Sequence, residues 1–182
     1  AEISRRLGDF GLRARAPGAP QGLDALLDEL WPLVLGNIPR NVVVLRDRAP
    51  REALVTLDVQ GLRAAFGNVL QNAYEAMPEG GQVVVRARLE PGADGAPAHA
   101  VLEVEDGGVG MSPETLERAF EPFFSSAAPR RQGLGLTQVR GFVERHGGTV
   151  SLSSRPGHGT VVRMQFPAAG AAAVAAPPAS AQ

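Results

Sequence analysis

The feature that most constrains the fold is one long amphipathic pattern at residues 59–77. Its apolar side chains fall within about a third of a helical circumference, and they are Leu62, Phe66, Val69, Leu70, Ala73 and Met77. Pro78 and the Gly80–Gly81 pair then end the pattern. The sequence therefore predicts a helix that buries one face in a core.

The other side of this helix carries polar residues in the stretch "NVLQNAYEAM", residues 68–77. At 100° per residue, Asn68, Asn72 and Glu75 gather within about 60° of one another. Asparagine is a mediocre helix former, so two of them in successive turns need a reason. Their oxygens would suit Mg²⁺, which also takes water and phosphate oxygens. The alternative is an ordinary solvated helix face.

Strands and helices alternate irregularly along the rest of the chain. Helices are expected at 23–35, 113–120 and 136–146, and strands at 41–47, 52–58, 82–90, 99–106, 149–154 and 160–166. This order predicts an α+β fold in which helices lie on one face of a sheet. Residues 168–182 are rich in Ala and Pro and are expected to form a disordered linker or tail.

Composition narrows the classes of partner. The 182 residues suffice for one domain, and their net charge of -1 gives no general attraction to nucleic acid or to a membrane surface. Cysteine is absent, which excludes disulfides and thiolate metal sites. No apolar run approaches the roughly 20 residues of a membrane-spanning helix. Because the chain starts without Met inside a helix-like segment, we expect it to be part of a longer protein.

A second motif, "DGGVGM" at residues 106–111, follows an expected strand. Asp106 offers a carboxylate that can only accept hydrogen bonds, which suits an amino group such as that of adenine. Gly108 and Gly110 lack side chains where a flat ring would have to approach the backbone. The alternative is a tight Asp-Gly turn. The motif is not a dinucleotide-binding fingerprint, because its third glycine is missing.

Two more motifs follow. "GLGL" at 133–136 leads into a helix, where exposed backbone N–H groups could hold phosphate, and Arg130 and Arg131 lie just before it. An ordinary flexible loop is the alternative. "FEPFF" at 120–124 puts Phe123 and Phe124 into a polar loop, either as anchors on the core or as a movable lid or partner contact.

The joint order of these four motifs resembles the ATP-binding catalytic domain of sensor histidine kinases, in the superfamily of gyrase, heat-shock chaperone and mismatch-repair ATPases. "NVLQNAYEAM" is similar to the N box of that family, "DGGVGM" to its first glycine box, "FEPFF" to its F box and "GLGL" to its second. The resemblance covers residues 17–167 and extends to the closing hairpin "RPGHGTVVRMQFP". Residues 1–16 resemble the end of a dimerisation-domain helix.

The resemblance implies a Bergerat-type two-layer sandwich, a mixed sheet of about five strands with three helices on one face. It implies that Asn72 coordinates Mg²⁺, that Asn68 lies near the phosphates, and that Asp106 bonds the adenine amino group. Gly108 and Gly110 would admit the ring, while Gly133 and Gly135 would wrap the phosphates. The expected nucleotide site also includes Glu75, Met111, Phe123, Phe124, Arg130, Arg131, Leu134 and Leu136.

Two positions depart from the family pattern. Arg131 stands where the family has a further glycine, and Ala127 stands where it has a lysine. Lysine is absent from the whole chain, so any cation in this site must be an arginine. We expect Arg130 or Arg131 to replace the lysine near the γ-phosphate.

Position 68 separates a kinase from a hydrolase. Hydrolytic relatives, and the related anti-sigma-factor serine kinases, are similar in placing a glutamate base there, whereas Asn68 cannot take a proton at neutral pH. None of the three histidines, His99, His146 and His158, is followed by the acidic residue that marks the family's phospho-acceptor. We therefore expect a protein-histidine kinase domain whose acceptor histidine lies outside this chain. The alternatives are a non-catalytic nucleotide- or partner-binding member and a purely structural module.

The resemblance also implies partners and a location. The expected partners are the dimerisation and phospho-acceptor domain of the same or a paired chain and a response-regulator receiver domain, within a homodimeric parent. Neither nucleic acid nor direct membrane contact is expected for this domain. Its location should be cytoplasmic, where ATP is found, even if the longer protein is membrane-anchored.

Overall fold

The computed structural model describes residues 18–36, 38–49, 51–92, 96, 98–124 and 133–169. In chain order the elements are β1 (Gln21–Gly22), α1 (Leu23–Leu35), β2 (Val42–Arg48), β3 (Leu54–Val55), α2 (Val59–Ala76), β4 (Gly81–Glu90), β5 (His99–Asp106), α3 (Pro113–Arg118), α4 (Gly135–Arg145), β6 (Thr149–Ser154) and β7 (Thr160–Pro167). The expected dimerisation-helix end at 1–16, most of the tail, and Ala127, Arg130 and Arg131 lie outside the described residues.

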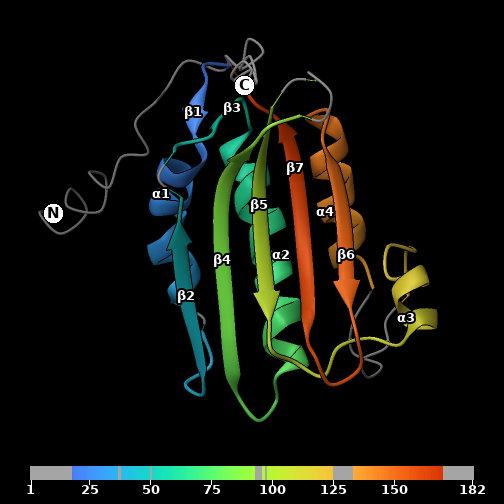
Figure 1. Cartoon of the computed structure of the whole chain (residues 1–182). Helices are drawn as coiled ribbons and strands as arrows, with labels where there is room; N and C mark the ends of the chain where they lie inside the picture. Colours follow the sequence, from blue (N-terminus) through green and yellow to red (C-terminus); the bar gives the residue numbers. More distant parts are fainter. Residues whose placement is uncertain are drawn as a thin grey trace, which may run out of the picture.

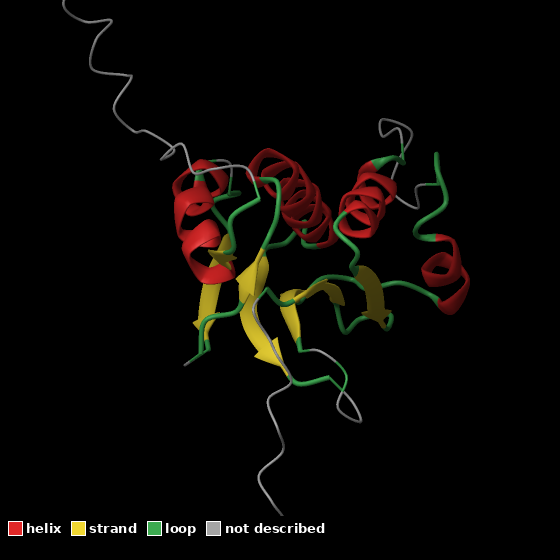
Figure 2. Cartoon of the chain, turned by 90° about the horizontal axis from the view of Figure 1, so that it is seen from above, coloured by secondary structure: helices red, strands yellow, loops and turns green. Residues whose placement is uncertain are grey.

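Five strands form one mixed sheet in the order β2-β4-β5-β7-β6 (Figure 1). The β2–β4 pair is parallel, and the other three pairs are antiparallel. Strands β1 and β3 form a separate two-stranded ribbon. Seen from above, α1, α2 and α4 lie together on one side of the sheet, and no helix of the described residues lies on the other side (Figure 2). The expected α+β sandwich is confirmed.

Helix α2 lies at the centre of the helical layer because its apolar stripe is continuous. Leu62 and Phe66 are fully buried, and Leu70 is 1% exposed. The opposing sheet face supplies alternate residues such as Val85 of β4 and Leu102 of β5. The predicted helix at 59–77 matches α2 to within one residue.

One predicted strand is much shorter in the structure. The expected strand at 52–58 is reduced to Leu54–Val55, which pairs with Gly22 and Gln21 of β1. Asp58 is instead the N-cap of α2, and its carboxylate accepts hydrogen bonds from the N–H groups of Gln60 and Gly61. The extended segment ends here because Asp58, as the N-cap, starts the helix at the next residue.

His146, at the C-terminal end of α4, contacts the N-terminal end of α2. Its Nε2 accepts the N–H of Asp58 at 3.2 Å, and its Nδ1 lies 2.9 Å from the carbonyl of Phe142. A ring nitrogen that accepts carries no proton, so the ring here is neutral with its proton on Nδ1. The contact with Asp58, which is far away in the sequence, therefore determines the tautomer of this ring.

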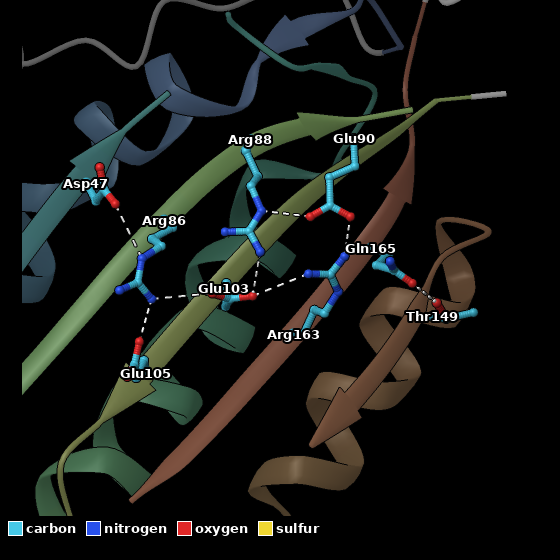
Figure 3. Close-up of polar contacts among 9 residues, drawn as sticks. All are labelled: Asp47, Arg86, Arg88, Glu90, Glu103, Glu105, Thr149, Arg163 and Gln165. Carbon is cyan, nitrogen blue, oxygen red and sulfur yellow. Dashed lines mark hydrogen bonds and ion pairs between the residues drawn. The ribbon is translucent and has the colours of Figure 1, made fainter. Parts of the chain in front are cut away.

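The helix-free face of the sheet carries a ladder of ion pairs (Figure 3). Asp47, Arg86, Glu103 and Arg163 follow one another across β2, β4, β5 and β7 in strand register. Glu103 accepts from Arg86, Arg88 and Arg163 at 3.3, 2.9 and 3.3 Å. Opposite charges on neighbouring strands stabilise a solvent-facing sheet surface.

No helix within the described ranges is long and apolar enough to cross a membrane.

Candidate functional site

A cavity of about 720 Å³ lies between α2, α4 and the end of the sheet where β5 stops. Its polar and glycine lining consists of Asn68, Gln71, Asn72, Glu75, Asp106, Gly110, Thr115, Gly133, Gly135, Gln138 and Thr160. Its apolar lining includes Val69, Ala73, Ala76, Met111, Phe124, Leu134, Leu136, Leu152 and Val162. The volume is within the range of small-molecule and cofactor sites.

Asp106 is the buried carboxylate of this cavity, with 6% of its surface exposed. The backbone N–H groups of Gly108 and Thr160 both donate to its Oδ1, at 2.9 and 3.2 Å. Among the described residues Oδ2 has no hydrogen-bond partner, so it can accept from a ligand. Burial raises the pKa of Asp106, and the two N–H donors offset part of this rise.

The glycines after Asp106 are required by contacts within the protein. A Cβ on Gly108 would lie 2.6 Å from the Cβ of Ala76 in α2. Gly110 has a φ of 67°, and a Cβ there would lie 2.0 Å from the carbonyl oxygen of Arg155. These contacts within the protein are enough to explain glycine at both positions, whether or not the ring of a ligand approaches them. An approach of a ring to Gly110, which lines the cavity, stays a prediction, and Gly108 lies outside the lining.

The β6–β7 turn contacts the glycine loop that follows Asp106, residues 107–110. The N–H of Gly157 donates to the carbonyl of Val109 at 2.7 Å. A Cβ on Gly159 would lie 1.8 Å from the carbonyl oxygen of Asp106. The turn "RPGHG" therefore holds the backbone on which Asp106 and Gly110 depend, a contact between segments about 50 residues apart in sequence.

The N-terminus of α4 lies against the asparagines of α2. A Cβ on Gly135, the first residue of α4, would lie 3.8 Å from both Nδ2 and Oδ1 of Asn72. The Nδ2 of Asn68 donates to Oε1 of Gln138, one turn into α4, at 2.9 Å. Unpaired backbone N–H groups at a helix start attract anions. This side of α2 is thus a cavity wall, and its asparagines are half-buried.

The Phe loop and the second glycine motif are in direct contact. The N–H of Phe123 donates to the carbonyl of Gly133 at 3.1 Å, and a Cβ on Gly133 would lie 2.6 Å from the carbonyl oxygen of Phe124. Phe124 lines the cavity with the guanidinium of Arg118 4.3 Å above its ring. Phe123 is 77% exposed, has a φ of 65°, and lies outside the lining.

Most of the predicted site residues therefore meet in one cavity. Those that line it are Asn68, Asn72, Glu75, Asp106, Gly110, Met111, Phe124, Gly133, Leu134, Gly135 and Leu136. Gly108 supports the lining and Phe123 projects outward, while Arg130 and Arg131 lie outside the described residues. Sequence reasoning missed Thr160 and Gln138. Gln138 could have been found from its place in the first turn of α4, but Thr160 reaches Asp106 only through sheet pairing.

Residues 57–170, more than half of the chain, match the family of "Histidine kinase-, DNA gyrase B-, and HSP90-like ATPase". This chain belongs to that ATPase family. The match includes all four sequence motifs and the whole cavity lining. The family match therefore indicates a nucleotide-binding domain.

The similar proteins place the chain within this family. It is 32% identical over 177 residues to the sensor kinase CckA of Brucella abortus, covering 92% of this chain and 19% of that protein. It is 41% identical over 135 residues to the histidine protein kinase DivJ of Caulobacter vibrioides, covering 71% and 21%. The fold matches a mycobacterial sensor histidine kinase, MprB, with a TM-score of 0.68 and 29% identity, covering 83% and 97%.

These comparisons identify the chain as an ATP-binding catalytic domain of the sensor histidine kinase type. The chain spans about a fifth of the length of these two curated relatives.

Proposed function

We propose that this domain binds Mg-ATP and donates the γ-phosphoryl group to a histidine outside the chain. One observation carries the proposal: a single cavity has the free oxygen of Asp106 at one wall and the N-terminus of α4, beside Asn72, at another. The first suits the amino group of a purine, and the second suits a phosphate chain. The ligand that has both groups is an adenine nucleotide.

The phosphate side has the donors that phosphoryl transfer requires. Gly133, Leu134 and Gly135 bring backbone N–H groups to the start of α4, where the helix dipole favours negative charge. Asn72 supplies a hard oxygen for Mg²⁺, which would take its remaining ligands from water and phosphate. When bound, the ion neutralises phosphate charge, and the protein contributes positioning and electrostatic stabilisation. Asn68 and Glu75 complete this wall.

The cavity favours transfer over hydrolysis. The resemblance implies that hydrolytic relatives have a glutamate base at position 68, whereas this chain has Asn68, whose amide donates to Gln138. An amide cannot remove a proton from water at neutral pH. Glu75 lies on the rim, where it accepts a hydrogen bond from Gln71 at 3.0 Å. We infer that the described lining of the cavity offers no base for hydrolysis at position 68, and that any acidic helper is contributed beside the acceptor.

The acceptor histidine is proposed to lie in another segment or chain. His146 is occupied by contacts to Asp58 and Phe142, and His99 opens β5 at the end of the sheet away from Asp106. The partner would be a dimerisation and phospho-acceptor domain, to which residues 1–16 would lead in a homodimeric parent. Exposed Phe123 is a suitable contact for it. A response-regulator receiver domain would take the phosphoryl group next, in the cytoplasm.

Residues 17–167 are proposed as the folded catalytic unit and 168–182 as a linker or tail. Arg130 and Arg131 are proposed to approach the γ-phosphate in place of a lysine. Replacing both with alanine should weaken ATP binding or phosphotransfer, whereas unchanged kinetics would exclude this role.

Titration of the purified chain with a fluorescent ATP analogue, with and without Mg²⁺, tests the binding step. Saturable binding that strengthens with Mg²⁺ is expected. The transfer step is tested by incubating the full-length protein with γ-labelled ATP and following acid-labile label, which is characteristic of phosphohistidine. Nucleotide binding without any transfer would favour the alternative, a non-catalytic member of the same fold. The absence of binding at millimolar nucleotide would refute the proposal.

A further inference from the structure

Three polar residues lie side by side across the site end of the sheet. Asp106 of β5 is paired with Thr160 of β7, and Thr160 is paired with Ser154 of β6. Asp106 and Thr160 line the cavity, whereas Ser154 lies behind them and outside the lining. Thr160 is 6% exposed, so bulk water is largely excluded as a hydrogen-bond partner of its hydroxyl.

The hydroxyl of Ser154 has three neighbours, which together determine the direction of each hydrogen bond. The N–H of Met111 donates to it at 2.8 Å, and the carbonyl oxygen of Gly159 lies 2.7 Å away. Thr160 Oγ1 is the third neighbour, at 3.0 Å. A carbonyl oxygen can only accept, so the one proton of Ser154 goes to Gly159. The remaining bond then requires Thr160 to donate its own proton to Ser154.

This arrangement determines what Thr160 can offer to a ligand. With its proton committed to Ser154, the hydroxyl of Thr160 presents only lone pairs to the cavity. The neighbouring carboxylate of Asp106 is also an acceptor. Two adjacent acceptors can bind an amino group, which has two protons. They disfavour a carbonyl oxygen at the same place. Such an oxygen would give up its hydrogen bond to water, and neither of these two acceptors could replace it.

We propose that Ser154 is a positioning residue for base selection. It holds Thr160 in the accepting orientation and ties the glycine loop to β6 through Met111. The cavity thereby favours a 6-amino purine over a 6-oxo purine. This inference rests on the proposed binding of ATP, and it adds a residue outside the cavity that controls the polarity of the base pocket.

The test compares two triphosphates that differ at this one position of the base, ATP and inosine triphosphate. The wild-type chain should prefer ATP by about 100-fold, because the 6-oxo group leaves buried acceptors unpaired. Ser154→Ala frees the proton of Thr160 to donate into the cavity, which should reduce the preference by roughly tenfold, mainly through tighter binding of inosine triphosphate. Ser154→Thr retains the hydroxyl and should retain the preference.

Ser153→Ala is the matched control, since Ser153 is the preceding residue of β6 and is exposed. It should leave the ratio of the two affinities at the wild-type value. Thr160→Val provides a second test in case Ser154→Ala does not fold, because it keeps the side-chain shape, removes the hydroxyl, and should also reduce the preference. Circular dichroism reports folding for each variant.

The outcomes distinguish the two proposals. A wild-type chain that binds neither triphosphate refutes the proposed function. A wild-type chain that binds both equally well refutes only the selection by Ser154 and Thr160. An affinity ratio that stays within about twofold of wild type in folded Ser154→Ala, or in Thr160→Val where the former does not fold, overturns the inference and leaves ATP binding intact.

Discussion

The backbone N–H of Thr160 donates to Oδ1 of Asp106 at 3.2 Å, from a strand that follows Asp106 by more than 50 residues. Together with the N–H of Gly108, this bond fixes one oxygen of the carboxylate and leaves the other for a ligand. The carboxylate is therefore oriented before any nucleotide arrives, which lowers the cost of binding.

Asp106→Asn should separate nucleotide binding from folding. The amide oxygen can still accept from Gly108 and Thr160, but the amide nitrogen would present a donor to the amino group of adenine. ATP affinity should fall about 100-fold. Thermal stability should be equal or higher, because burial of the charge raises the pKa of Asp106 and thus opposes its ionisation at neutral pH. Calorimetric titration and thermal unfolding measure the two effects.

Glu105→Gln is the control for this prediction, since the neighbouring residue lies on the ion-pair face of the same strand (Figure 3). It should leave ATP affinity unchanged. An Asp106→Asn variant with wild-type affinity would show that this carboxylate does not contact the base.

Asn72→Ala should weaken binding of ATP mainly in the presence of Mg²⁺. Loss of one oxygen ligand beside a charged group should cost roughly 10- to 100-fold in affinity, and the stimulation of binding by Mg²⁺ should shrink with it. Arg63→Ala, an exposed change on α2 outside the cavity lining, provides the comparison. If the variant kept the full magnesium dependence, Asn72 would not be a metal ligand.

Two glycines in the β6–β7 turn form a matched pair. Gly157 and Gly159 have φ values of 76° and 75°, but a Cβ on Gly157 meets nothing within 4 Å, whereas one on Gly159 meets the carbonyl oxygen of Asp106 at 1.8 Å. Gly157→Ala should cost about 1 kcal/mol of unfolding free energy through backbone strain alone. Gly159→Ala should cost more and also weaken ATP binding. Equal costs in chemical denaturation would contradict the support of Asp106 by this turn.

His146→Ala should reduce stability without changing nucleotide affinity. The substitution removes the acceptor for the N–H of Asp58 and the ring contact with Phe142, whose centroid lies 4.5 Å away. A loss of about 1 kcal/mol or more in unfolding free energy is expected. His158→Ala, in an exposed turn, should be near neutral. A strong fall in ATP affinity with His146→Ala would show that this distant contact shapes the cavity.

The ion-pair ladder should stabilise the fold less at acidic pH. Burial raises the pKa of Glu90, but hydrogen bonds from Arg88 and Arg163 outweigh that effect and lower it below its ordinary value of 4.5. A carboxyl whose pKa is lower in the folded than in the unfolded chain stabilises the fold above the unfolded-state pKa, and this stabilisation disappears as the pH falls through the folded-state pKa. Because the group is part-exposed, the effect should be modest.

Glu90→Gln should therefore lower the melting temperature at pH 7, and the difference from wild type should vanish well below pH 4.5. Glu117→Gln, on the exposed side of α3, should show no such convergence. A difference between wild type and Glu90→Gln that persisted unchanged at low pH would mean that packing and not charge is the source of the effect.

Local patterns in the sequence were enough for most elements. The 3.6-residue stripe of α2, the alternation in β5 and the paired runs of β6 and β7 each depend on neighbouring residues, and each was predicted to within about two residues. The prediction of a strand at 52–58 was too long, because Asp58 is the N-cap of α2 and the chain there starts a helix although the local residues favour an extended conformation.

The sequence by itself determined the order of the four motifs, and with it the family and the ligand class. It also determined the polar side of α2, because helical periodicity places Asn68 and Asn72 on one face. These features follow from residues close together in the chain.

Only the tertiary structure decided which distant residues meet. The row of Asp106, Thr160 and Ser154 follows from the strand order β5-β7-β6, and the reason for Gly110 is a carbonyl in the β6–β7 turn. Likewise His146 is neutral because it meets the start of α2. Strand order and helix packing follow from burial of one shared core, to which segments far apart in the chain contribute.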